Sequence, residues 1–237
     1  MALLETNQLS KRFGGVAALQ AVSVEQAPGE TLGMIGPNGS GKTTFVNAVT
    51  GNLRADSGTV TLDGATVLGR KPSELAGIGL VRTYQAVRVF GGLTAGANIA
   101  TANLLLGERA LAGAELDELL DWLRLGHVLD KDAGSLTLFE QRRLELAMRL
   151  VLRPKLIMLD EPVGGLAVTE VREMIKLLSE LKARTTLFVI EHTMRVIREL
   201  ADRVVVLVAG EKIADGPPAD ILRDRRVIEQ YLGTAHA

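Results

Sequence analysis

Residues 31–44 read TLGMIGPNGSGKTT. The run TLGMI is typical of a short buried strand, and the apolar stretch FVNAVTG that follows residue 44 is typical of a helix. Between them, residues 36–43 match the phosphate-binding pattern G-x-x-x-x-G-K-[ST]. Glycine lets backbone N–H groups turn inward around phosphate oxygens, and the helix directs its positive end at the same anion. The sequence therefore predicts a strand, a phosphate-binding loop and a helix in series.

The side chains of this loop have separate expected roles. We expect Lys42 to reach the β- and γ-phosphates of a nucleotide and the hydroxyl of Thr43 to bind Mg²⁺. The remaining nucleotide-binding positions are Gly36, Pro37, Asn38, Gly39, Ser40, Gly41 and Thr44. ATP and Mg²⁺ are thus the expected ligands.

A second motif, LIMLDEP, occupies residues 156–162. Four apolar residues indicate a buried strand, and ligands of open α/β sheets bind at the carboxyl ends of the strands. We expect Asp160 to bind Mg²⁺ through its water shell and Glu161 to polarise the attacking water. Alone, an apolar run followed by two acids also fits a solvated strand end. Beside a phosphate-binding loop, the pattern favours a catalytic site.

The rest of the chain indicates an α/β fold. Residues 3–35 carry short β-prone runs broken by turns, and residues 58–68 read as a hairpin with Asp63-Gly64 at its turn. Helical periodicity dominates from about residue 93 to 152. After Pro154, strand and helix patterns alternate, and residues 203–214 look like a strand pair turning at Ala209-Gly210. These patterns predict one domain over residues 1–237, with a helical subdomain inserted at about 93–152.

Composition narrows the possible functions. The 27 basic and 28 acidic residues nearly cancel, so the chain has no general attraction to nucleic acid or anionic lipid. The absence of cysteine excludes disulfides and thiolate zinc sites. The N-terminal stretch MALLETNQLSKRF does not resemble a signal peptide, and the longest apolar runs are strand-sized. We therefore expect any contact with a membrane to pass through a partner.

The order of motifs resembles that of an ABC-transporter nucleotide-binding domain, and most of all the ATP-binding subunits of branched-chain amino-acid importers. The segments that carry this resemblance are IGPNGSGKTT, RTYQ (82–85), EQRRLELA (140–147), LDEP, IEHTMRVI (190–197), ADRVVVLVAGEKIADGPPADI and YLG (231–233). The resemblance implies a P-loop NTPase (ABC ATPase) fold with a RecA-like parallel-sheet core, an N-terminal antiparallel β subdomain and an inserted helical subdomain.

The resemblance also implies roles for three side chains outside the loop. Phe13 should stack on the adenine, although minor-core packing is the alternative for a lone phenylalanine. Gln85 should lie near Mg²⁺ and the attacking water, where it links the nucleotide to a membrane partner. His192 should contact the γ-phosphate, although a histidine that caps a strand end is the alternative. The catalytic set implied by the resemblance is then Glu161, His192 and Gln85.

The chain departs from the family at the signature loop, which contacts the nucleotide of the opposite subunit. The family reads L-S-G-G-Q, or L-S-Y-G-Q in this subfamily, where this sequence has Leu136, Thr137, Leu138, Phe139 and Glu140. We expect Phe139 to crowd the partner's phosphate by its size and Glu140 to repel it by its charge. A second departure is Ala167, which stands where the subfamily has asparagine and cannot bridge the two sites.

Three functions remain open at this point. The first is the ATPase subunit of an importer for branched-chain amino acids or related small polar solutes, paired with permease subunits and served indirectly by a substrate-binding protein. The others are a regulatory cassette with weak ATPase and a soluble, non-transport ABC ATPase. In the first, the chain lies in the cytoplasm on the inner face of the membrane. The altered signature loop favours a heterodimer with a second cassette, because a homodimer would use the poor loop twice.

Overall fold

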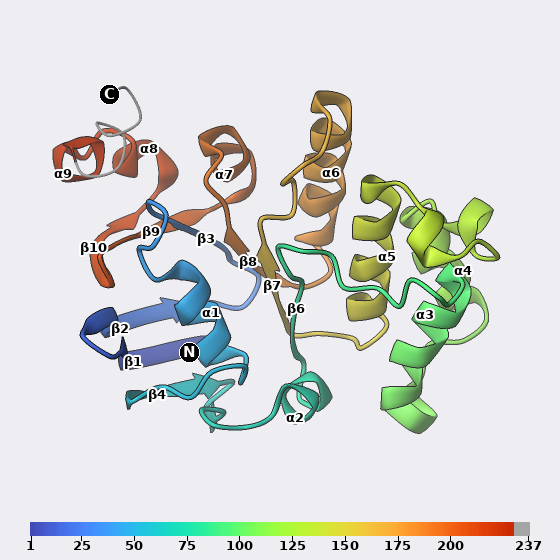
Figure 1. Cartoon of the computed structure of the whole chain (residues 1–237), viewed down its shortest axis with the longest axis horizontal. Coiled ribbons are helices and arrows are strands. Elements are labelled where there is room, and N and C mark those ends of the chain that lie inside the picture. The colour runs from blue at the N-terminus through green and yellow to red at the C-terminus, as the bar shows by residue number, and fades with distance from the viewer. Residues whose placement is uncertain (230–237) are drawn as a thin grey trace.

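A computed structural model describes residues 1–229 of the chain, apart from the side chains of residues 108 and 109. The YLG segment at 231–233 and His236 lie outside the described residues. Figure 1 shows two sheets toward one end of the molecule and a group of helices toward the other.

A six-stranded sheet forms the centre of the structure, with strand order β10-β9-β3-β8-β7-β6. Its strands are β3 (Thr31–Ile35), β6 (Leu80–Arg82), β7 (Leu156–Asp160), β8 (Thr186–Ile190), β9 (Arg203–Val208) and β10 (Glu211–Gly216). Neighbouring strands are parallel except for β9 and β10, which form an antiparallel pair around Ala209-Gly210 as predicted. Every residue of β3, β7 and β8 is buried, which explains why these strands are apolar without alternation.

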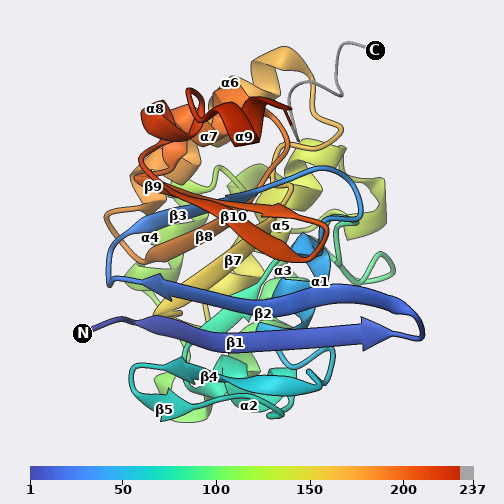
Figure 2. The ribbon, with the colours of Figure 1, turned by 90° about the vertical axis from the view of Figure 1, so that its left-hand side faces the viewer.

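A separate antiparallel sheet has the order β2-β1-β4-β5. Its strands are β1 (Leu4–Phe13), β2 (Val16–Gln26), β4 (Ser57–Leu62) and β5 (Ala65–Thr66). The predicted hairpin is present, because β4 and β5 pair across Asp63 and Gly64. Gln20 joins this sheet to the central one by donating from its backbone N to Gly210 O (2.8 Å) and from Nε2 to Ala209 O (2.8 Å). Figure 2 shows β1 and β2 running beside β10.

Helices complete the described fold. They are α1 (Lys42–Val49), α2 (Pro72–Gly77), α3 (Ala95–Asn103), α4 (Ala114–Trp122), α5 (Leu138–Leu150), α6 (Val168–Leu181), α7 (Met194–Leu200), α8 (Pro218–Ile221) and α9 (Arg225–Val227), with 3₁₀ turns at Leu104–Arg109, Gly126–Val128 and Ala133–Ser135. The helices α3, α4 and α5 fall within residues 93–152, and Figure 1 shows them grouped at one end of the molecule, with α5 next to α6. None of the described helices has the length and apolar character needed to span a bilayer.

Successive residues of the central strands face two different cores. On β7, Leu156 and Met158 pack with α1 and the antiparallel sheet, whereas Ile157 and Leu159 pack with α5 and α6. The first core includes Phe45 stacked on Phe188, with ring centroids 5.8 Å apart. The sheet is therefore covered on both faces, and the carboxyl ends of β3, β7 and β8 are held at one edge, where the nucleotide-binding and catalytic candidates lie.

Candidate functional site

The phosphate-binding loop connects β3 to α1 in the predicted manner. Gly36 and Gly41 have φ angles of 153° and 105°, which other residues rarely adopt. A Cβ atom at Gly36 would lie 2.0 Å from Leu207 O, and one at Gly41 would lie 2.3 Å from Ala18 O. Both glycines are thus required by backbone conformation and by close packing. The hydroxyl of Ser40 is buried and has no hydrogen-bond partner among the described residues, which leaves it available to an anion.

Lys42 folds back onto its own loop. Its Nζ donates to Gly36 O (2.7 Å) and Pro37 O (3.0 Å), and the side chain is buried. Burial lowers the pKa of Lys42, while the charges of Glu161 and Asp160 oppose that shift. The ammonium thus lies in the loop, within the electrostatic reach of both catalytic carboxylates. Thr43 follows it on the first turn of α1 and is exposed, so its hydroxyl is accessible to a ligand.

The three predicted catalytic side chains come together. Gln85 donates from Nε2 to Glu161 Oε2 (2.9 Å), and His192 Nδ1 lies 3.7 Å from Glu161 Oε1. Glu161 directly follows β7 and has a φ of 49°, and its backbone N donates to Ile190 O (2.9 Å). The carboxylate of Glu161 is thus at the centre of the group, between the segments that carry Gln85 and His192.

Asp160 ends β7 and lies in a buried ion pair. Arg82 donates from Nη2 to Asp160 Oδ2 (2.8 Å) and from Nη1 to Asn47 Oδ1 (2.5 Å) on α1. Burial raises the pKa of Asp160, and the positive charge of Arg82 counters that effect. Arg82 belongs to the RTYQ segment, but its contact with Asp160 was not predicted from the sequence.

The donor set at this edge suits a small hard cation. Mg²⁺ usually keeps several waters and takes one or two carboxylates together with substrate phosphates. Thr43, Gln85 and Asp160 offer a hydroxyl, an amide oxygen and one carboxylate. Among the described residues, there is no cluster of three or more acidic, histidine or cysteine side chains that could hold a metal alone. The residues therefore fit an ion that arrives with a nucleotide.

Phe13 ends β1, just before the Gly14-Gly15 turn. Its side chain is 51% exposed, so it does not pack in the core, which was the alternative considered from the sequence. Lys11 Nζ lies 5.6 Å from the centre of the Phe13 ring. One face of the ring is available to a planar group such as a nucleotide base.

The signature-loop residues form the start of α5. Thr137 caps the helix, and its backbone N and its Oγ1 both donate to Glu140 Oε2, at 2.8 and 2.9 Å. His127 Nε2 lies 3.3 Å from the other oxygen of Glu140. Burial raises the pKa of Glu140, but the hydrogen bonds from Thr137 outweigh burial and hold it below its usual range. Glu140 therefore places a carboxylate charge at the N-terminal end of α5.

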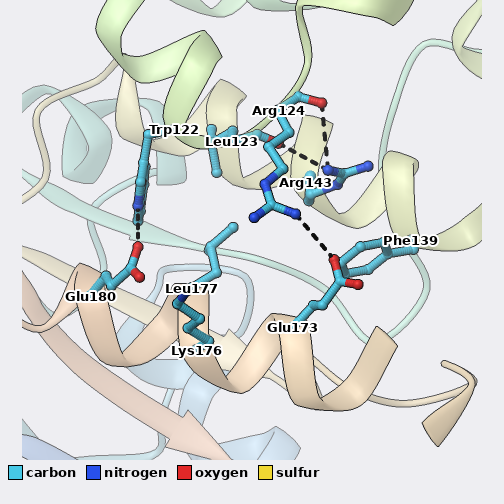
Figure 3. Close-up of a pocket in the computed structure, with 9 residues that line it drawn as sticks. All are labelled: Trp122, Leu123, Arg124, Phe139, Arg143, Glu173, Lys176, Leu177 and Glu180. Atoms are coloured by element: carbon cyan, nitrogen blue, oxygen red, sulfur yellow. Dashed lines mark hydrogen bonds and ion pairs between the residues drawn. The ribbon is translucent and has the colours of Figure 1, made fainter. Parts of the chain in front are cut away.

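The expectation for Phe139 was wrong. Its side chain is only 9% exposed and packs in the core that joins α5 to α6, so it does not project toward a neighbouring subunit. Figure 3 shows the ring between Arg143 and the helix α6 that carries Glu173 and Leu177. The guanidinium of Arg143 lies 4.5 Å from the ring centre. As a residue of α5, Phe139 can bury an apolar side chain by turning it inward, and it does so without a positive φ angle.

Three further buried charged residues lie near the site and were not predicted from the sequence. Arg142 and Glu145 lie on α5, and Glu191 directly precedes His192; their exposures are 6%, 1% and 0%. Glu191 accepts from the backbone N of Val163 (3.3 Å), which joins the segment after Glu161 to the segment that carries His192. The available signal was the i, i+3 spacing of Arg142 and Glu145, which places two opposite charges on the same side of α5.

Comparison with known proteins identifies the family. Residues 19–164 match the family model described as ABC transporter, and residues 211–237 match the model for branched-chain amino acid ATP-binding cassette transporters. The chain is 38% identical to the high-affinity branched-chain amino acid transport ATP-binding protein LivG of Salmonella typhimurium, over 98% of both chains. It is 34% identical to the probable LivG protein of Archaeoglobus fulgidus, over 98% of this chain and 96% of the other.

Solved structures agree with this assignment. The ADP conformation of an ATP-binding cassette of an ABC transporter has a TM-score of 0.87 and 31% identity, over 98% of this chain and 99% of the other. A dimeric cassette bound to ADP and phosphate has the same fold, with a TM-score of 0.80, 24% identity and coverage of 91% and 98%. The P-loop, the carboxylates that end β7 and these likenesses together show that the chain belongs to the ABC transporter family, as one of its ATP-binding cassettes.

Proposed function

We propose that this chain is the ATP-hydrolysing subunit of an importer for branched-chain amino acids or related small polar solutes. The observation that carries the transport assignment is the match of residues 211–237 to the branched-chain amino acid cassette model. Relatives over nearly the whole chain are branched-chain amino acid transport proteins by name, which supports the same solute class.

The geometry supports a separate role for each of the site residues in ATP hydrolysis. In this proposal, the backbone of the P-loop and Lys42 bind the phosphates, and Phe13 stacks on adenine. Glu161 orients and polarises the attacking water, since a general base must lie within hydrogen-bond reach of the proton that it takes. Gln85 and His192 hold the Glu161 carboxylate from two sides, consistent with their distances of 2.9 and 3.7 Å.

Mg²⁺ would be held by Thr43, Gln85 and Asp160. When bound, the ion supplies charge neutralisation between the β- and γ-phosphates. Arg82 holds the Asp160 carboxylate in a buried ion pair. The residues of the chain thus contribute orientation and charge, and the ion contributes electrostatic stabilisation of the transferred phosphoryl group.

In the proposed transporter, this chain is assembled with a second cassette and with permease subunits. The described helices cannot span a bilayer, so ATP hydrolysis would reach the membrane through permeases, with the chain on the cytoplasmic face. The negative charge of Glu140 at the signature helix favours a heterodimer, in which one site would use a partner's intact signature loop. The same observation supports an alternative function, a regulatory cassette that binds ATP and hydrolyses it slowly.

Uptake by the reconstituted transporter tests the proposal. The chain would be assembled with its permeases, second cassette and binding protein in vesicles containing ATP, and uptake of leucine, isoleucine and valine would be compared with uptake of urea. We expect ATP-dependent uptake of the amino acids that is lost in a complex carrying Glu161→Gln. ATP binding without uptake or turnover in the wild-type complex would favour the regulatory cassette.

A further inference from the structure

Three charged side chains of α5 are buried rather than exposed to solvent, those of Arg142, Arg143 and Glu145. Arg142 and Glu145 are one turn apart, at an i, i+3 spacing, and are 6% and 1% exposed. A buried charge is costly unless it is hydrogen-bonded or paired, so the partners of these two side chains indicate why they are present.

The guanidinium of Arg142 bridges two catalytic segments. Its Nη2 donates to Gly164 O (2.6 Å) and lies 3.4 Å from Gln85 O. Gly164 belongs to the turn that follows the catalytic carboxylate, where its own backbone N donates to Glu161 O (3.0 Å). A Cβ atom added at Gly164 would lie 3.4 Å from Arg142 Nη2, so the guanidinium fits closely against this turn. One side chain of α5 thus contacts the backbone of both Gln85 and the Glu161 turn.

Glu145 contacts the same segment one turn further along the helix. Its Oε1 accepts from the backbone N of Arg88 (3.3 Å), three residues after Gln85. Arg149, on the next turn of α5, lies 3.6 Å from the same oxygen and offsets part of the buried charge. The segment from Gln85 to Arg88 is therefore attached to α5 at two points.

We propose that Arg142 and Glu145 are positioning residues for ATP hydrolysis, which hold Gln85 against Glu161 from the signature helix. This inference rests on the proposed roles of Gln85 and Glu161. Arg142 and Glu145 act through other groups, because they contact the backbone of the loops that carry Gln85 and Glu161. A rotation of α5 that breaks the Arg142 contacts would separate the 2.9 Å pair of Gln85 and Glu161.

Steady-state ATPase of the assembled transporter tests the proposal. The variant is Arg142→Met, and the control is Arg203→Met, which removes a half-buried guanidinium on β9 that is hydrogen-bonded to Glu30 and Asp215, away from Gln85 and Glu161. We expect kcat to fall roughly tenfold or more in Arg142→Met, since a misplacement of about 1 Å can cost up to about a hundredfold. The Kd for ATP, measured on the isolated chain, should stay within about twofold of wild type. Equal kcat values for the two variants would overturn the proposal.

A double variant separates positioning from general damage. If Arg142 acts through Gln85, then Arg142→Met should have little further effect on kcat in a Gln85→Ala background. Additive losses would mean that Arg142 affects kcat independently of Gln85, which would contradict the proposal. If Arg142→Met does not fold, Arg142→Lys replaces it in the same cycle, because the lysine ammonium is one bond closer to the helix than Nη2 is and lacks the planar guanidinium geometry.

Hydrogen exchange gives a readout that does not depend on activity. In the Glu161→Gln background, ATP should alter exchange of residues 84–88 and of α5 together, and in Glu145→Leu the two regions should respond independently. Glu145→Gln keeps an acceptor for the Arg88 N–H and should behave as its parent does. Independent responses already in the parent would contradict the proposal. A wild-type complex that hydrolyses no ATP would instead contradict the proposed function.

Discussion

Arg82 and Asp160 form a buried ion pair at the centre of the nucleotide site, with Nη2 and Oδ2 2.8 Å apart and side-chain exposures of 6% and 5%. Through Asn47, the same guanidinium also reaches α1. The carboxylate expected to serve Mg²⁺ is thus paired with a cation of the protein itself. Arg82 connects three elements of the core, α1, β6 and β7.

Removing one partner of the Arg82–Asp160 ion pair should lower the free energy of unfolding. Arg82→Met leaves the Asp160 carboxylate buried without its cation, and we expect a loss of about 3–5 kcal/mol in the free energy of unfolding. Urea denaturation at pH 7 measures it. The double variant Arg82→Met/Asp160→Asn should be more stable than Arg82→Met alone, because it removes the uncompensated charge. A loss below about 1 kcal/mol in the single variant would show that the pair is not buried as described.

Glu161→Gln should bind ATP but turn it over roughly a hundredfold or more slowly, which is the range for loss of a general base. The amide is nearly isosteric with the carboxylate and can still accept the hydrogen bond from Gln85, so the fold should be preserved. Rapid-quench measurement of phosphate release, together with nucleotide binding, separates the two effects. Parent-like turnover would exclude Glu161 as the catalytic base.

Lys42→Ala should weaken productive ATP binding, because the loop loses its ammonium and the γ-phosphate charge is left uncompensated. A charge-assisted contact contributes about 1.5–3 kcal/mol, which corresponds to roughly a tenfold to hundredfold increase in the Kd for ATP. Titration calorimetry with Mg²⁺-ATP measures the change. An affinity within about twofold of wild type would contradict the assignment of the loop.

Substitutions of Glu140 and Phe139 have different expected effects in this structure, although the sequence suggested that both residues oppose ATP binding by a partner subunit. Glu140→Gln removes the charge but keeps an oxygen that can accept from Thr137, so ATPase of the isolated chain at high concentration should rise several-fold. Phe139→Gly should not act as a repair. It deletes a buried ring and places glycine in a helix, and we expect a stability loss of roughly 4–6 kcal/mol. No rise with Glu140→Gln would remove the argument for unequal ATP sites.

Glu145 should make stability depend on pH. Burial raises its pKa from 4.5 to about 7, so the native state binds the proton more tightly than the unfolded state does. Its contribution to stability is therefore fully present below about pH 4.5 and is lost as the pH rises toward 7, by roughly 3 kcal/mol in total. The unfolding free energy of wild type relative to Glu145→Gln, measured between pH 5 and 8, should fall over that range. A difference independent of pH would contradict the raised pKa.

The features that could be predicted from the sequence are those whose conformation is set by residues close to one another in the chain. The glycines of the P-loop, the carboxylates that end β7 and the turn at Ala209-Gly210 are set by short-range conformation, and the structure has each of them in the expected element. The contacts of Arg142, Glu145 and Arg82 depend on tertiary packing between segments far apart in the chain. Their charged side chains would be assigned to the surface by composition alone. The inward turn of Phe139 depends on the space between α5 and α6, which no local pattern reveals.

Lys42 donates to two carbonyls of its own loop, Gly36 O and Pro37 O. The ammonium therefore closes the loop on itself, because Gly36 and Pro37 lie six and five residues before Lys42 in the chain. Loss of this side chain removes an internal crosslink of the loop as well as a positive charge, so the shape of the loop and its attraction for phosphate depend on the same residue.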